Sequence, residues 1–256
     1  APIFNYFVEQ AKMLEPGYVS MIIPARWYNG GIGLNTFRAD MLNDKHLTKL
    51  VDFANSKDCF TTVDIGGGLC YFLWERDHED ECLVINMNSG EQDALRRSLN
   101  QYGNLFIRSN KAISIIEKIR AKANSFVDEM VSAIDTFGIP SKVRGHEEYE
   151  EGDILLVHSD GANSSKTSYI SRDVVTKNAH LIDKYKVRIS ILVPQNGEAG
   201  VKPEKGYRSM STPHLVYPGQ VDSFSYLNIG FFDNETEAEN FRKYMMCKLP
   251  RFMMRT

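Results

Sequence analysis

The stretch Val19-Ser-Met-Ile-Ile-Pro-Ala-Arg-Trp27 decides the fold class of this chain of 256 residues. Its first residues belong to a short apolar, β-branched run, Tyr18 to Ile23, which is typical of a buried strand in a parallel sheet. Pro24 ends the run, and residues 24–33 leave it as a loop. Ligands of open α/β sheets bind beyond the carboxyl ends of the strands, so this loop is predicted to line a cleft.

Helical and extended segments alternate around this stretch. Apolar residues recur at helical spacing over residues 3–14 and 34–42. Two more apolar runs, 47–53 and 68–74, predict strands, and the alternation implies an α/β sheet. The polar, glycine-rich connection 54–66 is too short for a crossover helix. Strand 68–74 is therefore predicted to run antiparallel to its neighbour.

The pattern changes beyond this sheet. Residues 83–87 predict an edge strand, and a domain boundary is placed near residues 90–100, which gives domains 1–95 and 96–256. The second domain is predicted to be α+β, with further elements from the same patterns. These are helices over 111–122, from 126 after the capping-box-like Ser125-Phe-Val-Asp128, and after Asn234, and strands over 153–157, 186–193 and 224–229.

Composition is that of a soluble globular protein, with 43% hydrophobic and 25% charged residues. No apolar run approaches the roughly 18 residues that a membrane helix needs, and the first residues lack a basic signal segment. The four cysteines form no C-x-x-C pair and stand at no metal-ligand spacing from histidine, so we expect reduced cysteines, a cytoplasmic protein and no metal site.

Charge is distributed unevenly along the chain. Residues 1–95 carry 7 basic and 14 acidic residues, a net charge of −7, whereas residues 166–217 carry 9 and 4, a net charge of +5. The basic segment is either ordinary solvated surface or a face for a polyanion. Its basic residues alternate with polar and aromatic ones and form a candidate DNA-binding face: Lys166, Arg172, Lys177, Lys184, Lys186, Arg188, Lys202, Lys205 and Arg208.

Five phrases in order resemble adenine-specific DNA methyltransferases of the Asn-Pro-Pro-Tyr class, found in bacterial restriction–modification systems. They are Val19-Ser-Met-Ile-Ile-Pro-Ala-Arg-Trp27, Leu47-Thr-Lys-Leu-Val-Asp-Phe53, Gly67-Gly-Leu-Cys-Tyr-Phe-Leu-Trp74, Asp183-Lys-Tyr-Lys-Val187 and Ile229-Gly-Phe-Phe-Asp233. The resemblance implies that residues 1–95 form the back half of a mostly parallel methyltransferase sheet with one antiparallel strand. It implies that residues 96–256 form a DNA target-recognition domain. The family transfers a methyl group from S-adenosylmethionine to the exocyclic amine of adenine in double-stranded DNA.

The resemblance also implies roles for individual residues. A base inside a duplex must be flipped out before its amine can react. An aromatic residue in the connection before the antiparallel strand stacks on the flipped adenine in this family, and Phe60 matches that position. The loop residues Pro24, Arg26, Trp27 and Asn29 are predicted to line the substrate cleft. The alternative is that Pro24 only ends a strand and that Trp27 and Phe60 pack in the core.

Two departures from the family limit the resemblance. No glycine-rich donor-binding motif precedes the first strand, and Asn-Pro-Pro-Tyr is absent from the chain. The glycines at 30, 31 and 33 make no dinucleotide loop, because position 36 is Thr36. The chain alone is therefore predicted to be inactive and to need an N-terminal catalytic half or a separate catalytic chain. A non-catalytic DNA-specificity module and an unrelated nucleotide-dependent α/β enzyme remain as alternatives.

Overall fold

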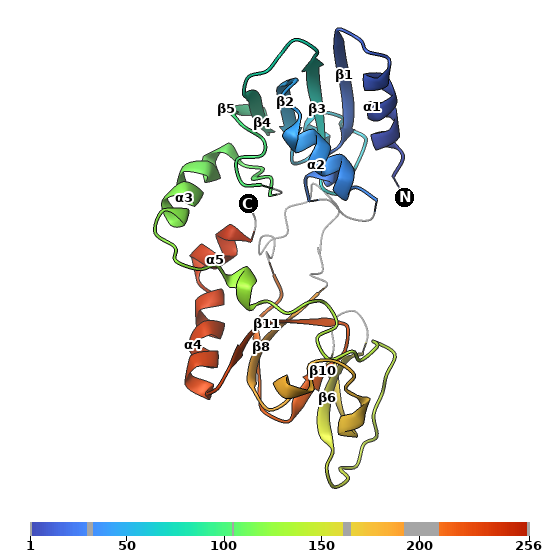
Figure 1. The fold of residues 1–256 in the computed structure, drawn as a ribbon, viewed down its shortest axis with the longest axis vertical. Helices are drawn as coiled ribbons and strands as arrows, with labels where there is room; N and C mark the ends of the chain where they lie inside the picture. Colours follow the sequence, from blue (N-terminus) through green and yellow to red (C-terminus); the bar gives the residue numbers. More distant parts are fainter. Residues whose placement is uncertain (1, 30–32, 104, 161–164, 192–209, 255–256) are drawn as a thin grey trace. The chain divides into compact units, whose positions relative to one another are not determined.

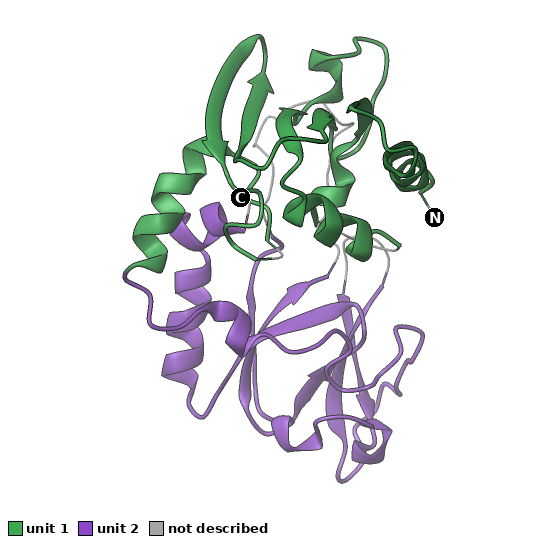
Figure 2. Ribbon diagram, turned by 45° about the horizontal axis from the view of Figure 1, so that its top comes forward, with its two compact units in different colours: residues 1–121, 196–206, 256 green, residues 122–195, 207–255 purple. Residues whose placement is uncertain are grey.

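A computed structural model describes residues 2–29, 33–103, 105–160, 165–191 and 210–254. The chain forms two compact units, one within residues 1–121 and one within residues 122–255 (Figure 2). Each unit has its own hydrophobic core. In the described part of the chain, no helix is both long and apolar enough to cross a membrane.

The first unit contains a five-stranded sheet in the order β1-β3-β2-β4-β5 (Figure 1). Its strands are β1 (Tyr18–Pro24), β2 (Leu47–Phe53), β3 (Leu69–Glu75), β4 (Cys82–Asn88) and β5 (Glu91–Arg97). β3 lies between β1 and β2 and runs antiparallel to both. β4 runs parallel to β2, and β5 runs antiparallel to β4. The prediction of an antiparallel third strand is thus confirmed.

Two details of the predicted sheet are wrong. The sheet is not mostly parallel, because only the β2–β4 pairing among its described strands is parallel. β4 is not an edge strand, because it forms a hairpin with β5. The two loop residues of that hairpin, Ser89 and Gly90, both have positive φ, 51° and 86°. That geometry matches the right-handed twist of the flanking strands and closes a two-residue turn.

Helices of the first unit connect the strands and cover the sheet. They are α1 (Phe4–Met13), η1 (Ala25–Asn29), α2 (Asn35–Asn43), η2 (Ser56–Asp58) and α3 (Asn110–Arg120). Val8 of α1 and Phe37 of α2 enter the same core as Phe72 of β3. Burying each such side chain contributes about 1.5–3 kcal/mol. α3 packs against β4 and β5, so the first unit extends to Ala121, beyond the expected boundary at residue 95.

The second unit contains two three-stranded sheets. One has the order β10-β6-β7 and the other β11-β8-β9. The strands are β6 (Ile154–Ser159), β7 (Ser165–Ile170), β8 (Tyr185–Ser190), β9 (His214–Val216), β10 (Gln220–Asp222) and β11 (Tyr226–Phe232). The helices are η3 (Val127–Met130), η4 (Arg172–Val174), η5 (Ala179–Leu181), α4 (Glu235–Met245) and α5 (Lys248–Met253). As predicted, α4 begins after Asn234, whose side chain caps the helix by accepting a hydrogen bond from the Glu237 amide.

The helix predicted from residue 126 does not form. Only the short 3-10 helix η3 occupies this region, and none of its residues is buried. Asp135 then adopts a φ of 64°, and Phe137 and Ile139 enter the core of the second unit with no exposed surface. Burial of these two side chains requires an irregular backbone path. The free energy gained by that burial outweighs the weak helix preference of the segment.

Candidate functional site

Two loops leave the sheet of the first unit at the edge where β1 and β2 end. η1 follows β1 directly, and residues 54–68 connect β2 to β3. Because β3 lies between β1 and β2 and neighbouring strands are about 4.8 Å apart, the two loops start about 10 Å from one another. The predicted cleft residues and Phe60 all lie in or next to these loops.

The loop over residues 54–68 is held in a defined shape. The Ser56 hydroxyl donates to the Val63 carbonyl and accepts from the Ile65 amide, both at 2.9 Å. Gly68 has a φ of 80°, and a Cβ atom there would lie 2.1 Å from the Phe53 carbonyl oxygen. Glycine is therefore required at this close backbone approach. Phe60 lies within this braced loop with 40% of its surface exposed.

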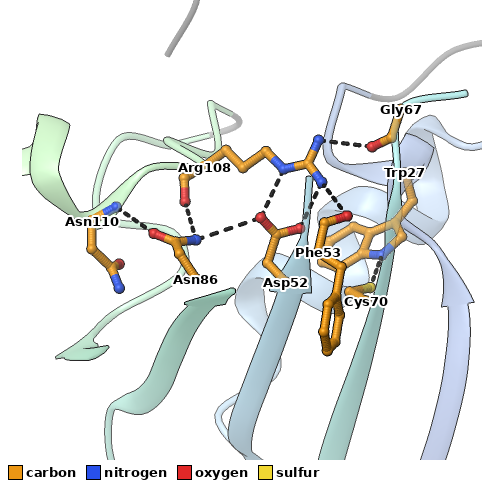
Figure 3. A network of polar contacts seen from close by, with 8 residues as sticks. All are labelled: Trp27, Asp52, Phe53, Gly67, Cys70, Asn86, Arg108 and Asn110. Carbon is orange, nitrogen blue, oxygen red and sulfur yellow. Dashed lines mark hydrogen bonds and ion pairs between the residues drawn. The ribbon is translucent and has the colours of Figure 1, made fainter. Parts of the chain in front are cut away.

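An ion pair between the half-buried Arg108 and the buried Asp52 fastens the loop to the sheet (Figure 3). Arg108 donates to both carboxylate oxygens of Asp52, the second-last residue of β2, at 2.8 Å. It also donates to the carbonyl oxygens of Phe53 and Gly67, at 3.2 and 2.7 Å. Burial alone would lower the pKa of Arg108, but its hydrogen bonds to Asp52 and the charge of Asp52 leave that pKa raised. The guanidinium thus bridges both ends of the loop that carries Phe60.

Two asparagines extend this network toward α3 (Figure 3). The Asn86 amide donates to the Arg108 carbonyl at 2.9 Å, and its oxygen accepts from the Asn110 backbone amide at 2.8 Å. Asn110 in turn accepts a hydrogen bond at 3.1 Å from Arg97, which is almost completely buried. Strand β5, the start of α3 and the loop over residues 54–68 are therefore joined by polar groups that satisfy one another's hydrogen bonds.

The predicted cleft residues divide into exposed and buried ones. Arg26 and Asn29 of η1 are exposed at the sheet edge, and Pro24 is half-buried. Trp27 has no exposed surface, and its indole donates to the Cys70 sulfur at 3.4 Å. Burial raises the pKa of Cys70 to about 11, so the sulfur is a neutral thiol at pH 7. The prediction that Trp27 lines a cleft is wrong, since its large apolar ring packs in the core.

Three residues of the proposed DNA-binding face are exposed and a fourth, Lys184, is half-buried; each has an acidic partner. Lys166 contacts Asp160 and Lys177 contacts Asp135, at 2.7 and 2.8 Å. The remaining two pairs join Arg172 to Asp183 and Lys184 to Asp233. Exposed pairs of this kind contribute about 0–1 kcal/mol and exchange partners readily.

Two further residues of that set, Lys186 and Arg188, are buried. Lys186 is fully buried, and its ammonium donates to the carbonyls of Ile182 and Lys184 at 2.9 and 2.8 Å. Burial lowers its pKa to about 8. Arg188 is 9% exposed, and burial lowers its pKa as well. Lys186 therefore cannot contact DNA in this fold. Lys202, Lys205 and Arg208 lie outside the described residues.

The residues of this edge do not fit S-adenosylmethionine on their own. The buried carboxylate at the edge, Asp52, already accepts two hydrogen bonds from Arg108. Because Asp52 is also only 2% exposed, it does not present an acceptor to the hydroxyl groups of a nucleoside. No group of three or more potential metal ligands occurs in the part of the chain that the structure describes. The described residues of this edge can present an aromatic face, a cation and an amide to a ligand.

Sequence reasoning missed the residues that shape this edge. Asp52 carries a signal that could have identified it, because a lone carboxylate inside an apolar strand needs a buried partner. Arg108 lies 56 positions away in a segment without a motif, so no local pattern points to it. Asn86 and Asn110 are recognisable only once the strand order is known.

Two comparisons with known proteins found similar sequences. Residues 1–60 match the Eco57I restriction-modification methylase family. The chain is 38% identical over 104 residues to an uncharacterized adenine-specific methylase of Mycoplasma pneumoniae (strain ATCC 29342 / M129 / Subtype 1). That match covers 38% of this chain and 24% of that protein, so the chain spans about a quarter of its relative's length. The first match is to restriction-modification methylases, and the second is to a protein named as an adenine-specific methylase.

Proposed function

We propose that this chain is the part of an adenine-specific DNA methyltransferase that recognises DNA and holds a flipped adenine. The proposal rests on the aromatic ring of Phe60. This ring is exposed on a loop that Ser56, Gly68 and Arg108 hold in place. A flipped base is held by stacking against apolar and aromatic side chains. A rigid platform loses little conformational entropy when the base stacks on it.

In this proposal Arg26 and Asn29 assist Phe60. Both are exposed on η1, beyond the carboxyl end of β1. A guanidinium can pair with a phosphate of the distorted strand, and an amide can both donate to and accept from a base edge. Trp27 keeps η1 in place from inside the core, where its ring packs against Phe37 and Phe106.

The second unit supplies DNA affinity in this proposal. Its cations Lys166, Arg172, Lys177 and Lys184 are held by surface carboxylates. Because exposed pairs are weak, phosphates can replace those carboxylates at low cost. Neutralised phosphates release counterions, so binding should weaken steeply as salt rises.

S-adenosylmethionine, bound elsewhere in the complete enzyme, supplies the methyl group. The buried Asp52 carboxylate of this edge is bound to Arg108, and the sequence has no Asn-Pro-Pro-Tyr segment to orient the amine. We therefore expect no methyl transfer by this chain alone. A radiolabelled methyl-transfer assay with the purified chain and genomic DNA tests this, and turnover would contradict it.

The test of DNA recognition uses a library of random duplexes. Duplexes that the chain retains are selected, and each adenine of the selected sequence is then replaced by 2-aminopurine, whose fluorescence rises on unstacking. We expect one position to brighten on binding. Phe60→Ala should change the fluorescence of that position and weaken binding about 10-fold, from the loss of one base–aromatic stack.

Phe60→Trp should restore the stack, which separates stacking from a loss of folding. Tyr244→Ala is the matched control, because Tyr244 is an aromatic residue of α4 that is 46% exposed. If the chain retains no duplex at low salt, or if no adenine brightens, the proposal fails. In that case a nucleotide-dependent enzyme unrelated to DNA becomes the better explanation.

A further inference from the structure

The first residue of α3 is anchored to the sheet of the first unit by polar contacts. Asn110 is 7% exposed, and its side-chain amide donates to the carbonyls of Val84 in β4 and Asp93 in β5, at 2.9 and 3.0 Å. Its side-chain oxygen accepts from Arg97, and its backbone amide donates to Asn86 (Figure 3). Separating buried polar groups that are paired in this way is costly. The start of the helix is therefore fixed to β4 and β5.

The other end of α3 is exposed and leads directly into the second unit. The buried apolar residues of the helix lie in its first two turns: Ala112, Ile113 and Ile116. In its last turn, Lys118 and Arg120 are exposed. The second unit begins at Lys122, two residues after the helix ends. A helix of 11 residues is about 16 Å long, so α3 is a rod that is fixed at its first turn and joined at its far end to the second unit.

Arg108, two residues before α3, connects this rod to the loop that carries Phe60. Its guanidinium donates to backbone carbonyls at both ends of the loop over residues 54–68. Its own carbonyl accepts a hydrogen bond from Asn86, the same side chain that accepts from the Asn110 amide. A tilt of α3 about its fixed first turn would therefore shift the backbone of Arg108 and, with it, the two loop ends that the guanidinium holds.

We propose that α3 couples DNA recognition by the second unit to base holding by Phe60, with Asn86 and Arg108 as positioning residues. This inference rests on the proposed function and adds a means of regulation to its site. Asn86 and Arg108 lie beyond residues 1–60, so the match to the methylase family assigns them no role. A ligand shifts an equilibrium only by its differential affinity for the two arrangements. The recognised duplex therefore favours the tilt of α3 that places Phe60 against the base.

The test removes the base, so that Phe60 can respond to DNA only through the protein. Phe60 is replaced by 4-fluorophenylalanine in the full 256-residue chain, and its fluorine NMR signal is recorded. The probe is the duplex selected from the random library, with the brightening adenine replaced by an abasic nucleotide. We expect the fluorine signal to shift when this duplex binds. A duplex of scrambled sequence should not shift it.

Two changes interrupt the coupling at different points. Insertion of Gly-Gly-Ser after Ala121 leaves the hydrogen bonds of Asn86 in place but releases α3 from the second unit. Asn86→Ala keeps the helix joined to the second unit but removes the bonds to Arg108 and Asn110. Each change should abolish the shift while the affinity for the duplex stays that of the wild-type chain. The two changes together should have no larger effect than either alone, because they act on one connection.

Matched controls make equivalent changes at the opposite end of the same sheet. Asn100→Ala removes a hydrogen bond of 2.8 Å to Asn43 in the exposed segment after β5. The same insertion placed after Glu79 lengthens the exposed turn before β4. Both controls should show the fluorine shift of the wild-type chain. Circular dichroism confirms that each variant is folded.

A fluorine signal that does not respond to the abasic duplex overturns the inference. A response of equal size in all variants also overturns it, because the DNA strand would then reach Phe60 directly. If an adenine brightens in the intact duplex while the fluorine signal ignores the abasic one, the inference fails and the proposed function stands. If the chain retains no duplex, the proposed function fails and this inference fails with it.

Discussion

The two units each bury charged side chains, but they satisfy them differently. In the first unit, Asp52 and Arg108 face one another in a bidentate pair, and the remaining donors of Arg108 reach backbone carbonyls. In the second unit, Asp222 is 2% exposed and accepts two hydrogen bonds from Asn228 rather than from a cation. Arg188 lies nearby and stacks on Tyr226 at 4.6 Å, and its Nε and Nη1 have no hydrogen-bond partner among the residues that the structure describes.

The Asp52–Arg108 cluster and the Asp222–Arg188 cluster are suited to different roles because their charges are paired to different extents. A fully paired buried charge is costly to disturb, so the Asp52–Arg108 pair fixes the geometry of the loop that carries Phe60. A buried charge that lacks a full set of partners changes its ionisation instead. Burial raises the pKa of Asp222 to about 6, although the charge of Arg188 and the hydrogen bond from Asn228 lower it. The first cluster positions a loop, and the second responds to pH.

The largest expected effect comes from breaking the paired cluster. Arg108→Met should lower the free energy of unfolding by about 3 kcal/mol or more, because Asp52 would keep a buried charge without a cation. Urea unfolding at pH 7 measures this. The double variant Asp52→Leu/Arg108→Met should recover most of the loss, since no buried charge remains. If the single and double variants are equally stable, the pair does not act as described.

The next largest effect on stability is expected from removing the charge of Asp222. The pKa of Asp222 is about 6 when folded, against about 3.9 in an unfolded chain. The folded state therefore binds more protons between these values, and the contribution of Asp222 to stability is lost as pH rises from 4 to 6. The loss amounts to about 3 kcal/mol, since each unit is worth 1.36 kcal/mol.

Asp222→Asn removes this dependence. An amide can still accept one hydrogen bond from Asn228, whose own side-chain oxygen is unpaired and can accept one in return. The variant should be more stable than the wild-type chain at pH 7 and no more stable at pH 4. Parallel urea titrations at both pH values measure the difference in free energy of unfolding between the variant and the wild-type chain. The contributions of the other carboxyl groups are common to both chains and cancel in this difference. A difference that does not change with pH would show that Asp222 is ionised throughout.

A third substitution sharpens the role of the paired cluster. Gly68→Ala should cost about 2 kcal/mol, because the new Cβ would meet the Phe53 and Ala54 carbonyl oxygens at 2.1 and 2.7 Å at a positive φ. It would also lie 2.8 Å from the Arg108 guanidinium. Gly66→Ala is the control, since a Cβ atom there would have nothing within 4 Å and the φ of Gly66 is not positive. Equal thermal stability of both variants would contradict the close approach.

The first unit was largely predictable because its apolar runs are local signals. β1, β2, β3, α1 and α2 lie where the periodicity of residues 3–74 predicts them, within one or two positions. β5 was missed because an edge strand that protects itself with charges resembles a loop in sequence. The failed helix after residue 126 has the converse cause, since Phe137 and Ile139 are recruited by strands far along the chain.

The sequence predicted those site residues whose positions follow from the order of the strands. It did not predict the burial or pairing of side chains that depend on distant neighbours. The positions of Phe60 and Arg26 follow from their place after two strands. The burial of Trp27 and Lys186 depends on neighbours that sequence does not identify, such as Cys70 for the indole and the carbonyls near Ile182 for the ammonium. The Asp52–Arg108 pair joins residues 56 positions apart, a separation that no short motif spans.

The smallest expected effect concerns an exposed pair, which contrasts with both buried clusters. Lys177 contacts Asp135 at 2.8 Å, and its side chain is 56% exposed. Lys177→Met should change the free energy of unfolding by less than about 0.5 kcal/mol, because solvent screens such pairs. If Lys177 contacts a phosphate, the dependence of log affinity on log salt should become less steep by about 1. Lys142→Met, which makes the same charge change in an exposed loop, is the control for net charge. An unchanged slope in Lys177→Met would remove this residue from the DNA-binding face while leaving the remaining cations to be tested in the same way.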